Sequence, residues 1–144
     1  MTTNVQLSER LHDAFSNARY DEVLSMVADD IECVSYSNGY AAKGKEGFRV
    51  FFMGFASAFP DIRITHRNVV ATGDWVVVEF GAEGTNTGSL LTPKGAAAPT
   101  GRKVTFNVCE IHQWKNGKLT RLVNYQDALS LLTQLGLLSQ PAGL

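Results

Sequence analysis

Two different spacings of apolar residues divide the chain into a helical part and an extended part. In most of the segment before Pro60, apolar residues recur every three or four positions, which is the period of an amphipathic helix. Thr3 and Gln6 form a capping-box pattern that starts the first predicted helix, and Asp21 can cap a short second one. The apolar stripe of the first predicted helix consists of Leu7, Leu11, Ala14, Phe15 and Ala18.

A third helix is predicted after Gly44, where aromatic residues fall three or four positions apart. Pro60 ends this helix, because proline forces the preceding residue out of the α region. We interpret the aromatic stripe as core packing rather than as a cofactor-binding pattern. The stripe consists of Phe48, Phe51, Phe52, Phe55 and Phe59.

The rest of the chain has the composition of β-strands, rich in Val, Ile, Thr and aromatic residues. Strands are predicted at 31–36, 62–71, 75–86, 103–114 and 119–125, and the Asn116-Gly117 pair predicts a tight hairpin between the last two. Residues 88–101, with three glycines and two prolines, predict a mobile hairpin tip or lid. A last helix at 127–135 ends at Gly136.

Helices followed by a meander of strands predict one α+β domain over residues 1–144, with a flexible tail at 139–144. We expect a curved antiparallel sheet wrapped around the helices, whose concave face encloses a pocket for a small organic molecule. A chain of 144 residues can bury such a core without disulfides or metal.

Composition excludes several classes of function. Hydrophobic residues make up 44% and charged residues 19% of the chain, which argues against disorder. The net charge of −1, without a Lys/Arg cluster, argues against a nucleic-acid partner. No apolar run predicts a membrane span or a signal peptide, so we expect a cytoplasmic protein with no membrane partner. Cys33 and Cys109 lack metal-binding spacing, and no metal is predicted.

The strand at 103–114 holds the most informative chemistry. Side chains alternate across a sheet, so Glu110 and His112 share one face with apolar neighbours. A buried Glu and His need partners. Two interpretations stay open: a mutually satisfied core pair, or pocket residues whose pKa values are moved toward neutrality for acid–base chemistry. The apolar residues on this face are Val104, Phe106, Val108 and Trp114.

Asp127 lies where the last predicted strand meets the last predicted helix, and it also has two interpretations. It can be the N-cap of that helix, which is the commoner role for Asp at such a position. It can also be a carboxylate at the edge of the concave face that exchanges protons with a ligand. The same residue can do both.

Other polar side chains are weaker candidates. His12, on a helix face with Glu9 and Asp13, is predicted to be solvent-exposed, and His66 is predicted to be mainly structural. Asn38 is explained equally well by its turn and by contact with a ligand. The predicted ligand-binding residues are Tyr36, Asn38, Phe55, Phe59, Phe106, Trp114 and Tyr125.

A series of short motifs, in a specific order, resembles the SnoaL-like polyketide cyclase family of the nuclear-transport-factor-2-like superfamily over nearly the whole chain. These motifs are Gly44-Lys45-Glu46-Gly47, Phe59-Pro60-Asp61, Gly84-Thr85-Asn86-Thr87-Gly88, Pro99-Thr100-Gly101-Arg102, Asn116-Gly117-Lys118-Leu119, Asn124-Tyr125-Gln126-Asp127 and Leu131-Leu132-Thr133-Gln134-Leu135-Gly136.

The resemblance implies a cone-shaped sheet around an apolar cavity, no cofactor and, often, a homodimer. In cyclases of this family an aspartate at the end of the last strand is the acid/base for an intramolecular aldol ring closure, and Asp127 occupies that position. The family also places polar residues on the preceding strand, where this chain has Glu110 and His112. Many relatives carry His where this chain has Asn86, and the loop at 89–98 is longer than usual.

The leading functional hypothesis is therefore proton transfer on a small hydrophobic carbonyl compound. Asp127 would remove a proton next to a carbonyl, and His112 with Glu110 would donate a hydrogen bond to the developing enolate oxygen. Epoxide opening or double-bond isomerisation in the same cavity is an alternative. Arg121, the only charged residue inside the last predicted strand, lies on the Asp127 face, but the second Asp that epoxide opening would need is not evident. A non-catalytic ligand-binding or assembly module is another alternative.

Overall fold

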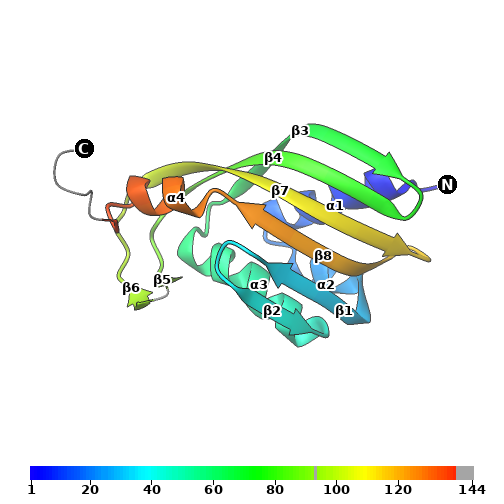
Figure 1. Cartoon of the computed structure of the whole chain (residues 1–144), viewed down its shortest axis with the longest axis horizontal. Coiled ribbons are helices and arrows are strands. Elements are labelled where there is room, and N and C mark those ends of the chain that lie inside the picture. Colours follow the sequence, from blue (N-terminus) through cyan, green and yellow to red (C-terminus); the bar gives the residue numbers. More distant parts are fainter. Residues whose placement is uncertain (93, 139–144) are drawn as a thin grey trace.

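One long, curved sheet with three helices along one side forms the body of the molecule (Figure 1). The computed structural model describes residues 1–92 and 94–138, so the predicted tail at 139–144 lies outside the described residues. The helices are α1 (Asn4–Ser16), α2 (Tyr20–Ser25), α3 (Lys45–Ala58) and α4 (Ala128–Gln134). The strands are β1 (Val27–Ser35), β2 (Tyr40–Lys43), β3 (Arg63–Thr72), β4 (Trp75–Thr85), β5 (Leu90–Thr92), β6 (Gly95–Ala97), β7 (Lys103–Lys115) and β8 (Lys118–Gln126).

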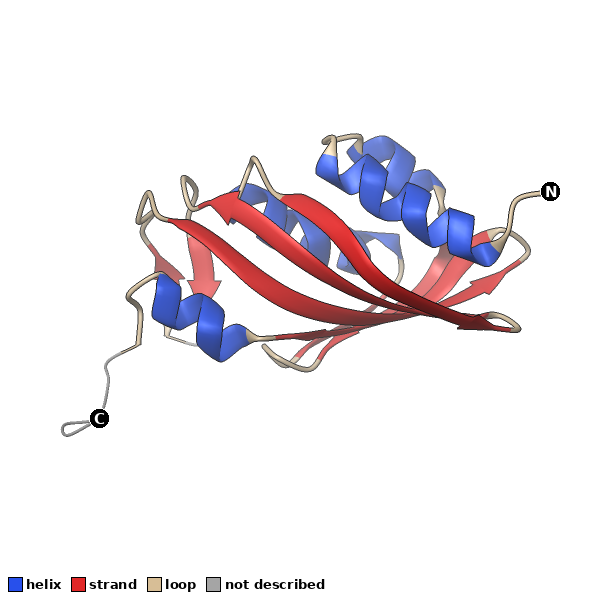
Figure 2. Ribbon diagram, turned by 90° about the horizontal axis from the view of Figure 1, so that it is seen from above, coloured by secondary structure: helices blue, strands red, loops and turns tan. Residues whose placement is uncertain are grey.

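The main sheet has the strand order β2-β1-β8-β7-β4-β3. The predicted meander of β3, β4, β7 and β8 is antiparallel throughout, whereas β1 joins β8 in parallel. The strand β2, which was not predicted, pairs with β1 at the edge. The α+β fold class with a curved sheet is confirmed, with one parallel pair in place of a purely antiparallel order (Figure 2).

Local signals fixed most element boundaries. The capping box of α1 is present, because Thr3 Oγ1 accepts from Gln6 N and Gln6 Oε1 accepts from Thr3 N. The prediction that Asp21 caps α2 is wrong, since that helix already begins at Tyr20 after Arg19. The predicted hairpin tip at 88–101 contains the short β5–β6 hairpin.

A β-bulge near the start of β8 decides which of its side chains face inward. Trp114 pairs with Leu119, but the next pair is Gln113 with Arg121, so Thr120 is an extra residue on β8. A bulge of this kind moves every later side chain of the strand to the opposite face. As a result, Asn124 lies opposite Glu110 on the inner face. Inner-face pairs are His112 with Leu122, Glu110 with Asn124 and Val108 with Gln126.

The core lies between the inner face of the sheet and the helices α1 and α3. All six inner-face positions of β7 from Val104 to Trp114 are buried, as the alternation predicted. The aromatic stripe of α3 packs against them, which confirms its interpretation as core. Within residues 1–92 and 94–138, no helix is both long and apolar enough to cross a membrane.

Candidate functional site

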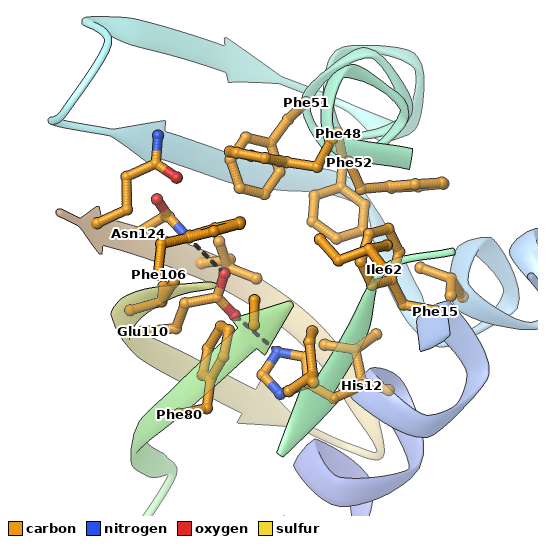
Figure 3. Close-up of a pocket in the computed structure, with 18 residues that line it drawn as sticks. His12, Phe15, Phe48, Phe51, Phe52, Ile62, Phe80, Phe106, Glu110 and Asn124 are labelled. Carbon is orange, nitrogen blue, oxygen red and sulfur yellow. Dashed lines mark hydrogen bonds and ion pairs between the residues drawn. The ribbon is translucent and has the colours of Figure 1, made fainter. Parts of the chain in front are cut away.

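A small chamber of about 60 Å³ lies between α1, α3 and the inner face of the sheet (Figure 3). Its wall is almost entirely apolar, and aromatic rings from α3, β4 and β7 supply much of it. Four polar side chains interrupt this wall: His12, Glu110, Asn124 and Gln126. A water molecule needs roughly 10–15 Å³ of such volume, so the chamber admits a few water molecules or one end of a ligand.

An entrance groove of about 420 Å³ lies beside the chamber and shares Phe51, Phe55 and Gln126 with it. The turn after β1, the helices α3 and α4, and the strand β5 form its walls. No charged side chain is among the described residues that line the groove. We refer to these two adjoining spaces, which share the three residues, as the funnel. The groove alone falls within the range of small-molecule sites, about 300–1,000 Å³.

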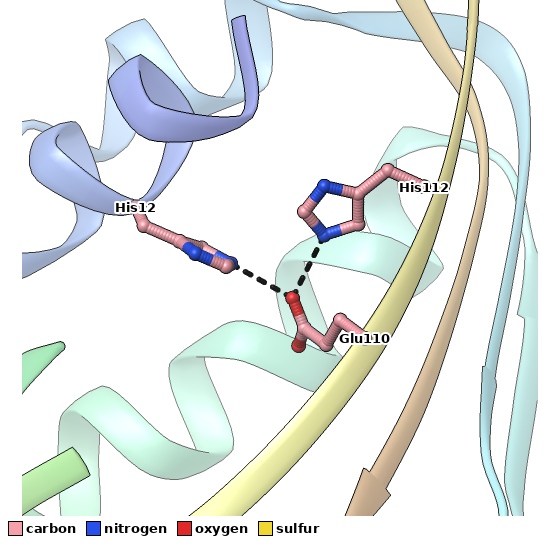
Figure 4. Close-up of side chains that lie close together, drawn as sticks. All are labelled: His12, Glu110 and His112. Carbon is pink, nitrogen blue, oxygen red and sulfur yellow. Dashed lines mark hydrogen bonds and ion pairs between the residues drawn. The ribbon is translucent and has the colours of Figure 1, made fainter. Parts of the chain in front are cut away.

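Glu110, on β7, is the centre of a buried cluster at the narrow end of this funnel (Figure 4). Its Oε1 lies 2.8 Å from His12 Nε2 and 2.9 Å from His112 Nε2. Its Oε2 accepts a hydrogen bond of 2.8 Å from Asn124 Nδ2. The carboxyl group therefore has three hydrogen-bonding partners, and only 5% of Glu110 is exposed to solvent.

Ser8 and Trp114 fix His112 on the Nδ1 side of its ring. Trp114 Nε1 donates to Ser8 Oγ at 2.9 Å, and Ser8 Oγ lies 2.8 Å from His112 Nδ1. An ionised carboxylate only accepts hydrogen bonds, so His112 Nε2 carries the proton and donates to Glu110 Oε1. In the neutral ring Nδ1 is then the acceptor, and Ser8 Oγ donates to it. His112 thus acts as a neutral, fixed donor to the carboxylate.

The charges of the cluster follow from burial and these contacts. Burial raises the pKa of the Glu110 carboxyl, but hydrogen bonds from His112 and His12 outweigh it and leave the pKa below its ordinary value. Burial lowers the pKa of His112, although its bond to Glu110 opposes this. Burial, together with the nearby His12 and His112, lowers the pKa of His66 to about 4. Glu110 is therefore ionised, and His112 and His66 are neutral, at neutral pH.

These pKa shifts predict that the folded protein is sensitive to acid. His66 and His112 have lower pKa values folded than unfolded, so the unfolded state binds more protons below the ordinary value of 6.5. Stability should fall as the pH drops from 7 to 4, and further below 4.5 through Glu110. We expect the midpoint of thermal unfolding to drop by at least about 3 °C, roughly 1 kcal/mol in a domain of this size. Calorimetry across this range checks it, and a constant midpoint would contradict it.

The cluster also contains residue types that bind divalent cations. One donor atom each from His12, Glu110 and His112 lies within 4.8 Å of the others. Each of these atoms is already hydrogen-bonded to another member of the cluster at 2.8 or 2.9 Å. We therefore treat the cluster as a hydrogen-bonded network.

The prediction that His12 is solvent-exposed is wrong, because only 6% of it is exposed. The helix α1 lies against the sheet along a broader stripe than its aliphatic residues indicate. Ser8, four positions before His12, is also fully buried, and this spacing was the available signal. The polar chamber residues Asn124 and Gln126 were also missed, since their inward orientation depends on the bulge in β8.

The structure does not bring Asp127 to Glu110. Asp127 is exposed, and its Oδ1 accepts from Ser130 N, which confirms the N-cap interpretation. It lines neither the chamber nor the groove, but an open depression that shares Val108 and Gln126 with the chamber. Arg121 likewise donates to Glu32 on β1, outside the cavity, so it offers no support for epoxide chemistry.

The predicted ligand-binding residues divide into three groups. Phe55 and Phe106 line the chamber, and Asn38 lines the groove while its Oδ1 accepts from Tyr40 N. Phe59 and Trp114 are buried in the core but line neither space. Tyr36 and Tyr125 stack on each other, with ring centroids 5.2 Å apart, and are 59% and 46% exposed. These two side chains line neither the chamber nor the groove, and Tyr125 lines the depression that also contains Asp127.

Comparison with solved structures finds the same fold in several bacterial proteins. A protein from Jannaschia sp. CCS1, described as a candidate SnoaL-like polyketide cyclase, is 23% identical with a TM-score of 0.82, covering 96% of this chain and 93% of that one. AclR from Streptomyces galilaeus, described as a candidate hydroxylase, is 21% identical with a TM-score of 0.81, covering 96% and 89%. IdmH from Streptomyces antibioticus, described as a candidate polyketide cyclase, is 21% identical with a TM-score of 0.79, covering 94% and 99%.

At these identities the structural comparisons establish the fold alone. No curated protein sequence matches the chain. The sequence model of one family, however, matches residues 5–135, which is most of the chain and includes every element from α1 to α4. The chain therefore belongs to the SnoaL-like polyketide cyclase family.

Proposed function

We propose that this protein is a cofactor-independent enzyme that moves a proton on a small, neutral, hydrophobic carbonyl compound, as in an aldol-type ring closure or an isomerisation. The observation that carries the proposal is an ionised carboxylate, Glu110, at the closed end of an apolar funnel. A carboxylate that lines a cavity and has a pKa shifted by burial and by specific partners is a candidate for a chemical role. Membership in the cyclase family supports the same reaction class.

The walls of the funnel favour a neutral ligand. The groove offers aliphatic and aromatic surface together with hydroxyl and amide groups, and no charged side chain among its described residues. Gln126 lines both groove and chamber, and its buried Oε1 has no hydrogen-bond partner among the described residues. This oxygen can accept from a hydroxyl or enol group of a ligand whose apolar body fills the groove.

Glu110 is the best-placed proton acceptor in the chamber. Its carboxylate can take the proton from a carbon next to the ligand's carbonyl and later return it to the product. Asn124 also lines the chamber, and its amide has a second hydrogen that can donate to the enolate oxygen. His12 and His112 both contact Oε1 of this carboxylate, whereas Asn124 Nδ2 contacts Oε2. Oε2 is therefore the carboxylate oxygen beside the Asn124 amide.

Blocking the groove provides the test of this proposal. Gly54 lines the groove on α3, and a Cβ atom added there meets nothing within 4 Å. We expect the wild type to accelerate deuterium uptake from heavy water at the carbon between the two carbonyls of benzoylacetone. Gly54→Ala should retain this rate, and Gly54→Trp should lose at least about tenfold, because its ring occupies the groove.

Two results would contradict the proposal. One is a wild-type rate equal to that of buffer, and the other is a Gly54→Trp rate equal to that of Gly54→Ala. Stabilisation of the protein against heat by the diketone, without any exchange, would identify a binding module instead of an enzyme. The Gly54→Ala control also reports on the fold, since Ala is favoured over Gly within a helix by up to about 1 kcal/mol.

A further inference from the structure

A line of hydrogen-bonded groups leads from Glu110 away from the ligand funnel. His12 Nε2 lies 2.8 Å from Glu110 Oε1, and His12 Nδ1 lies 2.8 Å from His66 Nε2. His66 belongs to β3 and is only partly buried. Among the described residues, His66 Nδ1 has no hydrogen-bond partner. The buried side-chain atoms of these residues that lack a partner do not include it, so His66 Nδ1 is accessible to water.

The other histidine of the cluster has no comparable exit. His112 is fully buried, and beyond its Nδ1 the contacts end at Ser8 and the indole of Trp114. An indole N–H donates a hydrogen bond but does not release its proton at ordinary pH, so this branch is closed. The two histidines therefore bind the same carboxylate oxygen but differ in their connection to solvent (Figure 4).

We propose that His66 carries protons between the buried His12 and bulk water, by a route that does not pass through the ligand funnel. When His12 holds a proton on each ring nitrogen, its Nδ1 proton passes to His66 Nε2, and His66 releases its own Nδ1 proton to water. The reverse steps load His12 again, and each passage moves one proton. The use of this relay in turnover rests on the proposed function, whereas the relay itself does not.

The surroundings of His66 fit a relay that holds a proton only briefly. It faces His12 from α1, the ring of Phe80 from β4, and Glu110 and His112 from β7. With its pKa lowered to about 4, His66 is neutral at neutral pH and does not retain a proton taken from His12. Such a route can reset the charge of the Glu110–His12 pair while a ligand blocks the chamber.

Proton exchange of the ring N–H groups tests the relay in the ligand-free protein. We expect magnetic resonance on isotope-labelled histidine to show at least about tenfold faster exchange with water for His12 than for His112. His66→Gln keeps an amide near the position of Nε2 but cannot relay a proton, so it should slow His12 exchange at least about tenfold and leave His112 unchanged. In His66→Ala, added imidazole should restore the fast exchange of His12.

Unchanged His12 exchange in His66→Gln would overturn the relay, because protons would then enter through the funnel. Equal slowing of His12 and His112 would overturn it as well, since that result reports a general change in opening of the fold. No ligand is used in this experiment. Failure of the benzoylacetone test would therefore overturn the proposed function without changing this result.

Discussion

Replacing Glu110 with leucine is expected to destabilise the folded protein by about 3–5 kcal/mol, because three buried donors lose their acceptor at about 1–3 kcal/mol each. Leucine fills the space but accepts no hydrogen bond. His12 Nε2, His112 Nε2 and Asn124 Nδ2 would each lose their acceptor in an apolar interior. Urea-induced unfolding followed by circular dichroism measures the difference from the wild type.

A second substitution distinguishes the lost contacts from a loss of packing. His12→Leu added to Glu110→Leu removes one stranded donor, so we expect the double variant to be more stable than the sum of the single variants by about 1–3 kcal/mol. Purely additive losses would contradict the description of the two residues as one hydrogen-bonded unit. A single Glu110→Leu loss below about 1 kcal/mol would contradict it as well.

Deleting Thr120 is expected to leave the register of β8 and the fold intact. Thr120 is the extra residue of the bulge, so without it Leu119 and Arg121 become neighbours that still pair with Trp114 and Gln113. Arg121 therefore stays outside the cavity, and Asn124 keeps its hydrogen bond to Glu110. We expect the deletion to cost at most about 1–3 kcal/mol, which is less than the total stability of a domain, about 5–15 kcal/mol.

A matched substitution separates the bulge from the side chain of Thr120. Thr120→Ala keeps the bulge and loses only the contacts of its hydroxyl with Gln113, so it should cost at most about 1–2 kcal/mol. Soluble expression and thermal unfolding of both variants provide the comparison. A deletion variant that fails to fold, while Thr120→Ala folds, would contradict the assignment of Thr120 as the extra residue of the bulge.

Sequence periodicity was sufficient to predict the architecture. The capping box at Thr3, the aromatic stripe before Pro60 and the Asn116-Gly117 turn each correspond to an observed element. Alternation on β7 also predicted that Glu110 and His112 share a buried face. Such local signals depend on the neighbouring residues alone. The parallel pairing of β1 with β8 joins distant segments, and no local pattern specified it.

The outward position of Asp127 has a specific physical origin. In a tight hairpin closed by Asn116-Gly117 without a bulge, Arg121, Tyr125 and Asp127 would follow the inner face of β7. The single extra residue, Thr120, sends them outward and turns Asn124 and Gln126 inward. A polar residue such as Thr gives no sequence signal for a bulge, so the choice between the two faces could not be made from the pattern.

The prediction that His12 is exposed was wrong because the buried stripe of α1 is wider than the pattern of its apolar residues. Its neighbours Glu9 and Asp13 are exposed, but His12 lies four positions after the buried Ser8 and three before the buried Phe15. The flank of α1 that carries Ser8 and His12 also contacts the sheet, through His112 and Glu110 of β7. The contact between His12 and Glu110 joins residues 98 positions apart, beyond the reach of any local pattern.

The central claim is that Glu110, and not Asp127, is the proton-transferring carboxylate. The most direct test compares Glu110→Gln with Asp127→Asn in benzoylacetone deuterium exchange, after both variants are shown to be folded. Asn is as good a helix cap as Asp, so the second variant changes charge without removing the cap. We predict that Glu110→Gln loses about 10²–10⁴-fold in rate while Asp127→Asn stays near the wild type. Loss in Asp127→Asn with retention in Glu110→Gln would contradict the account.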